Sequence, residues 1–237
     1  MVTALFSLPP IGVGTAQIES LTSYLARLAE AHSVTVGTLV GEVIAEELRK
    51  VYLLRSSKHG GSRFYEQASG LNGSGKQATD LSSALFRLTG CDVSSLTLQS
   101  WRDILPAIKL LRNKKAWCPI CLENWRDNHQ TIYEPLIWYF KLSNVCNLHN
   151  IVLNTRCPLC ESEIPVLSRK SRNGYCFLLW LLAWLTKGLY SKDWIFEFFM
   201  GPFCRIQYRW FINKHTLFTV KLLWRIHKKS NWDNRRN

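Results

Sequence analysis

Residues 117–121 read Trp117-Cys118-Pro119-Ile120-Cys121, and the chain continues with Cys146-Asn147-Leu148-His149, Cys157-Pro158-Leu159-Cys160 and Cys176. Two residues between paired ligands let one tight turn aim both side chains at a single ion. Pro119 and Pro158 stiffen two of these turns, because the proline ring fixes φ. The first residues carry no basic segment typical of a secretory signal, so we expect metal binding rather than disulfides.

The spacing divides the ligands into two sets of unequal completeness. A complete Cys₃His set, which would bind Zn²⁺ with no open position and therefore structurally, consists of Cys118, Cys121, Cys146 and His149. The second set has three visible ligands, Cys157, Cys160 and Cys176. A repeat of the two-residue spacing would place its fourth ligand at position 179, where the chain has Leu179.

Three interpretations of the second set stay open. A distant group such as Cys204 or His215 could complete the tetrahedron. Water could fill the fourth position, as at a catalytic zinc, although no Asp or Glu lies beside Cys176 to act as a base. The third interpretation is that the site is damaged.

Two helical patterns precede the cysteines. Apolar residues repeat with helical spacing after Thr15, which we expect to cap the helix, and again from Leu39 to Leu48. A short turn between them makes the pair resemble a helix-turn-helix. Any helical hairpin gives this pattern, however, and Glu42, Glu46 and Glu47 on the second helix would repel phosphates.

The predicted fold class is mainly α with small zinc-ribbon or zinc-knuckle elements. We predict a helical, helix-turn-helix-like part over 1–55, a flexible linker over 56–79, a helical core over 80–113, a paired zinc module over 114–177 and an atypical basic, aromatic tail over 178–237. The linker contains Gly70-Leu71-Asn72-Gly73-Ser74-Gly75-Lys76-Gln77. We reject a P-loop here, because Gln77 replaces the hydroxyl that binds Mg²⁺.

The net charge of +13 favours a polyanionic partner, most often nucleic acid. Residues 1–176 account for +5 and residues 177–237 for +8. Around the predicted zinc module, the candidates for contact with DNA phosphates are Lys114, Lys115, Arg156, Arg169, Lys170 and Arg172.

Several segments in order resemble the TniQ/TnsD family. They are Leu8-Pro9-Pro10, the run from Glu19 to Ala29, Leu71-Asn72-Gly73, Leu88-Thr89-Gly90, Trp117-Cys118-Pro119-Ile120-Cys121, and the paired knuckles from Cys146 to Cys160. The resemblance covers about residues 8–177 and fits the short TniQ type. It implies a non-enzymatic adaptor that links target DNA, or a target-recognising complex such as a CRISPR-type complex, to an AAA+ regulator and a transposase.

Two other functions are weighed against the adaptor. The first is a sequence-specific, zinc-containing DNA-binding protein that reads an attachment site, as TnsD-type proteins do. The second is a zinc hydrolase that uses the three-cysteine set, although the sequence offers no acid–base pair for it. We expect a cytoplasmic, nucleoid-associated protein with no membrane partner, because no apolar run reaches the roughly 18 residues of a membrane span.

The damaged interpretation takes a concrete form at the start of the tail. Phe177-Leu178-Leu179-Trp180 can be encoded TTT TTA TTG TGG, and deletion of one T gives Phe-Tyr-Cys-Gly, which restores a cysteine at position 179. Residues 177–237 also hold 15 of the 29 aromatic residues and only three acidic ones. The hypothesis is that residues from about 178 onward are read out of frame. Sequencing the gene through this T-run tests it, and an intact frame would refute it.

Overall fold

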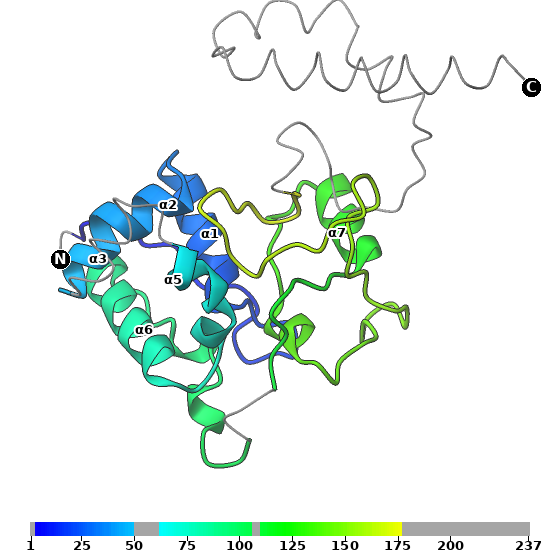
Figure 1. The fold of residues 1–237 in the computed structure, drawn as a ribbon, viewed down its shortest axis with the longest axis horizontal. Helices are drawn as coiled ribbons and strands as arrows, with labels where there is room; N and C mark the ends of the chain where they lie inside the picture. Colours follow the sequence, from blue (N-terminus) through cyan, green and yellow to red (C-terminus); the bar gives the residue numbers. More distant parts are fainter. Residues whose placement is uncertain (1–2, 50–61, 106–109, 177–237) are drawn as a thin grey trace, which may run out of the picture. The chain divides into compact units, whose positions relative to one another are not determined.

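The computed structural model describes residues 3–49, 62–105 and 110–176 (Figure 1). Within these ranges the regular elements are helical, and antiparallel pairing occurs only as isolated bridges. The predicted class, mainly helical with small zinc-type elements, is confirmed. The predicted tail, with Leu179, Cys204 and His215, lies outside the described residues. None of the described helices has the length and apolar character needed to cross a membrane.

Helix α1 (Leu21–Ala31) begins later than the sequence predicts. Its N-cap is Ser20, whose Oγ accepts the backbone N–H of Ser23 at 3.2 Å. Thr15, the predicted cap, instead closes a turn by donating its hydroxyl to the carbonyl of Gly12 at 2.8 Å. The prediction was wrong by about one and a half turns, because either hydroxyl residue is a suitable cap in sequence.

A second helical segment follows through α2 (Val36–Thr38), the π-helical stretch η1 (Leu39–Ile44) and α3 (Ala45–Glu47). Thr35 caps it by accepting the N–H of Thr38 at 3.1 Å, and Ser33, with φ of 56°, lies in the turn before it. The predicted helix–turn–helix pair is therefore present. Glu42 and Glu46 are exposed on the second segment.

Part of the predicted linker is ordered, because residues 62–89 form α5 (Ser62–Glu66), η2 (Ala68–Asn72) and α6 (Lys76–Thr89). Leu71 and Asn72 are buried. The amide of Asn72 accepts the N–H of Thr22 and donates to its hydroxyl, both at 3.0 Å. These contacts tie the glycine-rich stretch to α1, so the flexible linker predicted for 56–79 does not hold for 62–79. Residues 56–61 lie outside the described ranges.

The chain after α6 is less helical than predicted. Gly90, with φ of 73°, ends α6 as its sequence indicates, because glycine adopts this left-handed conformation without strain. Only two short 3₁₀ turns follow, η3 (Ser94–Leu96) and η4 (Gln99–Trp101). The helical core predicted over 80–113 does not continue through residues 102–105, which form a turn and a bend.

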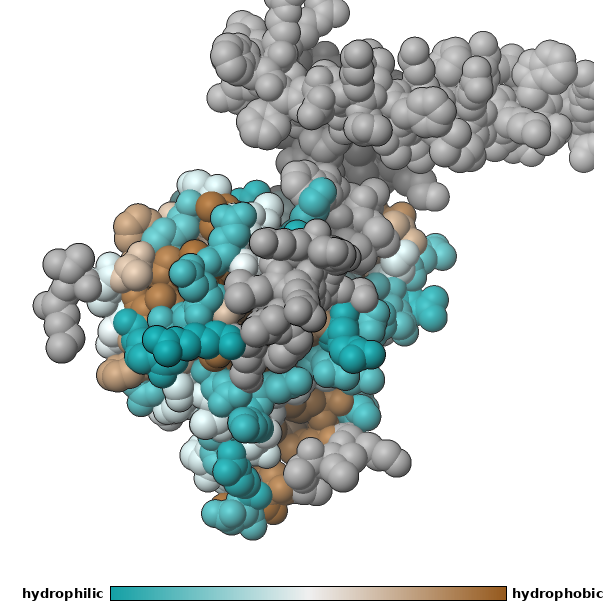
Figure 2. All heavy atoms as spheres, turned by 60° about the vertical axis from the view of Figure 1, so that its left-hand side comes forward, coloured by the Kyte–Doolittle hydropathy of each residue, from teal (hydrophilic) through white to brown (hydrophobic). Residues whose placement is uncertain are grey.

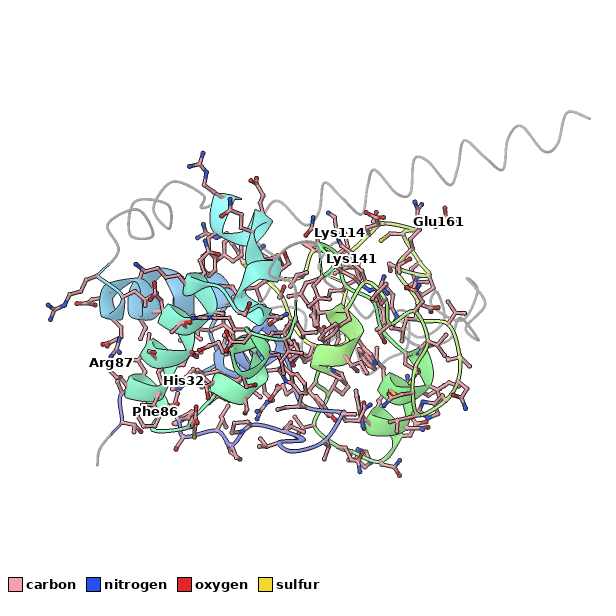
Figure 3. The ribbon with its side chains drawn as sticks, turned by 90° about the horizontal axis from the view of Figure 1, so that it is seen from below. His32, Phe86, Arg87, Lys114, Lys141 and Glu161 are labelled. Carbon is pink, nitrogen blue, oxygen red and sulfur yellow. The ribbon has the colours of Figure 1, made fainter. Side chains whose placement is uncertain are left out.

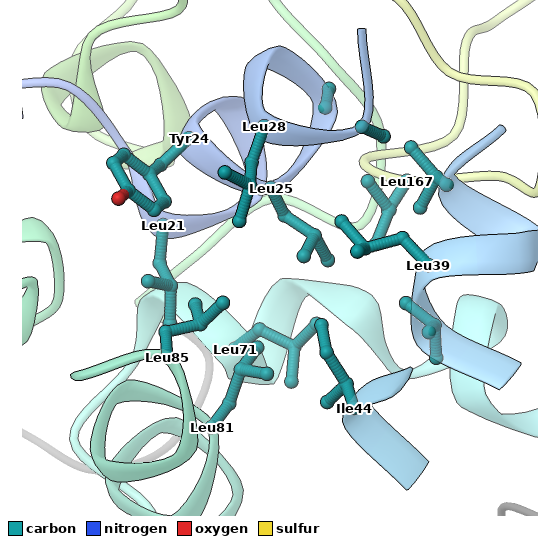
Figure 4. Packing of buried hydrophobic residues seen from close by; sticks show 14 of the residues in the cluster. Leu21, Tyr24, Leu25, Leu28, Leu39, Ile44, Leu71, Leu81, Leu85 and Leu167 are labelled. Carbon is teal, nitrogen blue, oxygen red and sulfur yellow. The ribbon is translucent and has the colours of Figure 1, made fainter. Parts of the chain in front are cut away.

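The main core lies between α1, the second helical segment and α6 (Figure 4). Leu21, Leu25 and Leu28 of α1 are fully buried, as their helical spacing predicts. They share one cluster with Leu39 and Ile44 of the second segment, with Leu81 and Leu85 of α6, and with Leu167 from the region after the knuckles. We call residues 3–49 and 62–105 the helical half, and residues 110–176 the knuckle half.

The knuckle half contains α7 (Pro119–Asp127) and η5 (Leu136–Tyr139) and has its own cluster of buried side chains. The sequence predicts a packed layer here. Tyr133, Leu136 and Trp138 are buried as expected, and burial of the Trp138 ring favours packing over base stacking. Leu142, which follows in the same apolar stretch of sequence, is 88% exposed and lies outside this layer.

Residue Glu134 joins the two halves through its backbone and its side chain. Its N–H donates to Ser23 Oγ at 2.9 Å, and its carbonyl accepts the N–H of Ser20 at 3.0 Å. Its buried carboxylate accepts from Lys115 Nζ at 2.6 Å and from the hydroxyl of Tyr139. Burial, followed by the charge of Glu134, raises the pKa of Tyr139 well above its usual value, so the phenol keeps its proton and donates.

Replacement of Lys115 should therefore destabilise the fold. Lys115→Ala leaves the Glu134 carboxylate buried without its cation, and we expect the free energy of unfolding to fall by about 3–5 kcal/mol in chemical denaturation. Lys114→Ala is the matched control, since Lys114 is exposed and its loss should change the value by less than about 0.5 kcal/mol. Equal small effects from both variants would show that the buried pair does not support the fold.

Candidate metal centres

The start of α7 positions the first two candidate ligands. Cys118 is the N-cap of the helix, and its Sγ accepts the backbone N–H of Cys121 at 3.5 Å. Pro119 occupies the first turn, where its missing N–H costs no hydrogen bond. The N-cap position and the first turn of α7 therefore place the sulphurs of Cys118 and Cys121 on the same side, as the two-residue spacing predicts.

A tight knuckle presents the second pair of ligands. The N–H of Cys146 donates to the carbonyl of Ile151, and its carbonyl accepts the N–H of Asn150, both at 2.8 Å. Asn150 has a φ of 52°, a conformation that asparagine tolerates better than most residues. The turn brings His149 back beside Cys146.

The four donors of this first cluster lie at the distances a tetrahedral zinc requires. Zn–S bonds of about 2.3 Å and Zn–N bonds of about 2.0 Å place neighbouring sulphurs about 3.8 Å apart and a sulphur about 3.5 Å from the nitrogen. Here Sγ of Cys121 and Sγ of Cys146 are 3.7 Å apart. His149 Nδ1 lies 3.5, 3.3 and 3.7 Å from Sγ of Cys118, Cys121 and Cys146.

The electrostatics of the first cluster also suit a cation. The hydrogen bond from the Cys121 thiol lowers the pKa of Cys118 to about 5. The same contact, together with burial, raises the pKa of Cys121. The thiolate of Cys118 thus opposes ionisation of the Cys121 thiol. A divalent cation bound among the sulphurs offsets the repulsion between the two negative charges.

Asn124 supports the histidine from α7. Its side-chain amide lies 3.3 Å from Nε2 of His149. The atom at this distance is the amide nitrogen Nδ2; if Nδ1 binds a metal, Nε2 carries the proton and donates, so the amide must turn over to present its oxygen. Asn124 is not among the predicted site residues, although its position three residues after Cys121 on a helix was a usable signal.

The second cluster repeats the knuckle turn. The N–H of Cys157 donates to the carbonyl of Ser162 at 3.0 Å, and its carbonyl accepts the N–H of Glu161 at 2.8 Å. Glu161 has a φ of 57°. Counted from the first cysteine, these positions match those of the Cys146 knuckle, and so do the flanking bridges Val145↔Val152 and Arg156↔Glu163.

The two clusters end differently. Cys160 Sγ and Cys176 Sγ lie 3.7 Å apart, and Cys157 completes a group of three thiols. Among the described residues this group has no fourth donor. All seven predicted ligands thus fall into two clusters, each able to hold a metal ion, and their sulphur-rich donor sets are of the type that zinc prefers.

The predicted DNA-contacting residues do not all reach the surface. Lys114, Arg156, Arg169, Lys170 and Arg172 are exposed. Arg172 forms an ion pair with Glu30 of α1.

Lys115, also predicted to meet phosphate, is a correction: it is buried and paired with Glu134. The extended backbone that bridges Lys114 to Pro165 explains the difference, because successive side chains of an extended chain point to opposite faces.

Substitution of single ligands should separate the two clusters. We expect Cys146→Ser to lose the ion of the first cluster and to lower the thermal midpoint more than Cys160→Ser does, because the Cys₃His set is complete. Elemental analysis for zinc together with thermal denaturation measures both effects. Cys91→Ser is the control, since Cys91 belongs to neither cluster. An unchanged zinc content in Cys146→Ser would contradict the assignment.

Loss of the support for His149 should weaken metal binding without abolishing it. For Asn124→Ala we expect a zinc dissociation constant about 10–100-fold higher, measured by competition with a chromogenic chelator. Asn124→Asp restores an acceptor and should recover most of the affinity. An affinity unchanged in Asn124→Ala would show that the ring needs no partner at Nε2.

Comparison with known proteins agrees with this arrangement. The TniQ family model matches residues 10–153, which is more than half of the chain and contains α1, α6 and all four donors of the first cluster. No curated protein matches the chain. The resemblance seen in the sequence is thereby confirmed. The protein belongs to the TniQ family, whose role lies in the selection of targets for transposition.

Proposed function

We propose that this chain is an adaptor in transposition target selection that links target DNA, or a target-recognising complex, to an AAA+ regulator and the transposase. The observation that carries the proposal is the TniQ match over residues 10–153. A complete Cys₃His set supports it, because such a site leaves a zinc ion no open position for a substrate. The proposal assigns both clusters a structural role as Zn²⁺ sites.

The packing between the halves suits an adaptor that must hold two partners at a set separation. Besides the contacts of Glu134, the side chain of Asn173 donates to the carbonyl and the hydroxyl of Ser23, at 3.1 and 3.0 Å. The N–H of Leu136 donates to the carbonyl of Ile18 at 2.8 Å. These buried hydrogen bonds favour one fixed arrangement of the helical and knuckle halves.

The DNA contacts are proposed at one edge of the knuckle half. The segment from Pro165 to Arg172 runs beside Lys114, which is labelled in Figure 3, and carries Arg169 and Lys170 on the surface. It also meets the helical half, where the N–H of Gly37 donates to the carbonyl of Arg169 at 2.9 Å. Cations on such an edge contact phosphates rather than bases, so binding is insensitive to sequence and weakened by salt.

A base-reading role for the second helical segment is not proposed. Glu42 and Glu46 are exposed on it and would face the phosphates of a bound duplex. Recognition of the target is therefore assigned to a partner. A guide-directed complex of the CRISPR type, or a separate sequence-reading protein, would fill that role.

The adaptor role can be tested with purified components. A purified AAA+ transposition regulator and its transposase are mixed with target DNA, and the amount of ATPase on the DNA is measured with and without this chain. We expect the chain to increase loading of the ATPase and to bind it directly. Loading that does not depend on the chain would contradict the proposal.

Charge reversal on the proposed edge should weaken DNA binding. For the triple variant Lys114→Glu, Arg169→Glu, Lys170→Glu we expect at least a tenfold loss of affinity for a 30-base-pair duplex in fluorescence anisotropy. The slope of log K against log salt should shrink by about 0.9 for each lost phosphate contact. Lys76→Glu, an exposed change on the helical half, is the control. An unchanged salt slope in the triple variant would remove this edge as the DNA site.

A further inference from the structure

A cavity of about 450 Å³ lies between the glycine-rich stretch before α6 and the turn after η4. Its size falls within the range of sites that hold small ligands or short peptide segments. Neither the metal clusters nor the proposed DNA-contacting residues line it. We call it the Leu/Lys pocket and define it by Leu98, Leu105, Leu110, Leu111, Lys76 and Lys141.

One wall of the pocket is aliphatic, and its apolar character continues onto the open surface. The four leucines come from η3–η4, from the turn that follows, and from the start of the knuckle half. Trp101 and Ile104, which precede Leu105 in sequence and do not line the pocket, are 51% and 72% exposed. In Figure 2, small groups of apolar residues show among hydrophilic ones in the lower part of the view. An apolar surface that leads into a cavity is typical of a binding site.

The opposite wall is a glycine-rich loop held in place from outside. The guanidinium of Arg102 donates to the carbonyl of Ser74 from two nitrogens, at 3.1 and 2.8 Å. A Cβ added at Gly75 would meet no atom within 4 Å, so this side of the loop borders open space. The wall is therefore fixed and accessible before any ligand arrives.

The charge on the pocket has one sign. Lys76, at the start of α6, and Lys141, from the knuckle half, are both exposed at its rim (Figure 3 labels Lys141). None of the described lining residues is acidic; Asp103 lies in the neighbouring turn but does not line the pocket. A complementary ligand combines aliphatic or aromatic groups for the leucines with carboxylates for the two lysines.

The wall chemistry favours a peptide over nucleic acid. Single-stranded nucleic acid is held by aromatic rings on which the bases stack, and the described lining residues include none. Leucine side chains instead suit apolar side chains of a peptide. We propose that the Leu/Lys pocket docks a short peptide segment of a partner protein in which apolar residues are flanked by Asp or Glu. This goes beyond the adaptor role and holds whether or not that role is correct.

The test begins with peptide selection on the full-length protein. A library of random displayed peptides is selected against the zinc-loaded chain, and the most enriched sequence is made as a fluorescein-labelled peptide for anisotropy. We expect enriched sequences that combine Leu, Ile or Phe with Asp or Glu. A selection without such a consensus overturns the proposal.

Variants then locate the binding. Lys76→Glu with Lys141→Glu, and separately Leu105→Ser, should each weaken peptide binding at least tenfold. Lys114→Glu with Arg156→Glu, which makes the same charge change at residues that do not line the pocket, should not. Wild-type thermal midpoints and zinc contents show that the variants are folded. Binding that survives both pocket variants overturns the proposal, and so does displacement of the peptide by a 20-mer of oligothymidine, which would identify a nucleic-acid groove.

The outcome is separable from that of the proposed function. The pocket variants should keep the affinity for duplex DNA, whereas the triple variant of the DNA edge should keep the affinity for the peptide. Failure of the peptide test with intact DNA binding and ATPase loading would remove the pocket alone.

Discussion

The carboxylate of Glu134 is the constraint on which the two halves of this protein depend. It is buried, so it needs partners to offset the cost of removing its charge from water. Lys115 and Tyr139 supply them from the knuckle half, while the backbone of the same residue is bonded to Ser20 and Ser23 at the start of α1. Glu134 thus links the buried ion pair with Lys115 to the position of helix α1.

The second constraint is a knuckle turn that occurs twice in the knuckle half and holds the side chains of each metal cluster together. The turns that begin at Cys146 and Cys157 share their hydrogen bonds, their residue of positive φ and their flanking bridge. Each is too small to bury a core of its own, and a metal ion held by the side chains can supply the missing stabilisation. The clusters differ in the second donor of the knuckle, which is His149 in the first and Cys160 in the second, and in how they are completed: the first by α7, the second by Cys176 and no further donor among the described residues.

These constraints leave different surfaces for different partners. The edge that runs from Pro165 to Arg172 presents cations beside the second helical segment, and it is the proposed contact for DNA. The Leu/Lys pocket lies where the glycine-rich loop meets the knuckle half, and its mixture of leucines and lysines suits an acidic, apolar peptide. A member of the TniQ family with both surfaces could hold a nucleic acid and a protein at once.

The ligand residues, the buried face of α1 and the end of α6 at Gly90 followed from the sequence alone. Each rests on short-range chemistry: ligand spacing, helical periodicity and the backbone freedom of glycine. The burial of Lys115, the ordering of the glycine-rich stretch by Asn72 and the Leu/Lys pocket came only from the tertiary structure. Lysine and glycine have a strong average preference for exposed, flexible positions. That preference was overridden here because the stabilising partners are distant in sequence. Glu134 lies 19 residues from Lys115, and Thr22 lies 50 residues from Asn72 in the glycine-rich stretch. These pairs meet only in the folded chain.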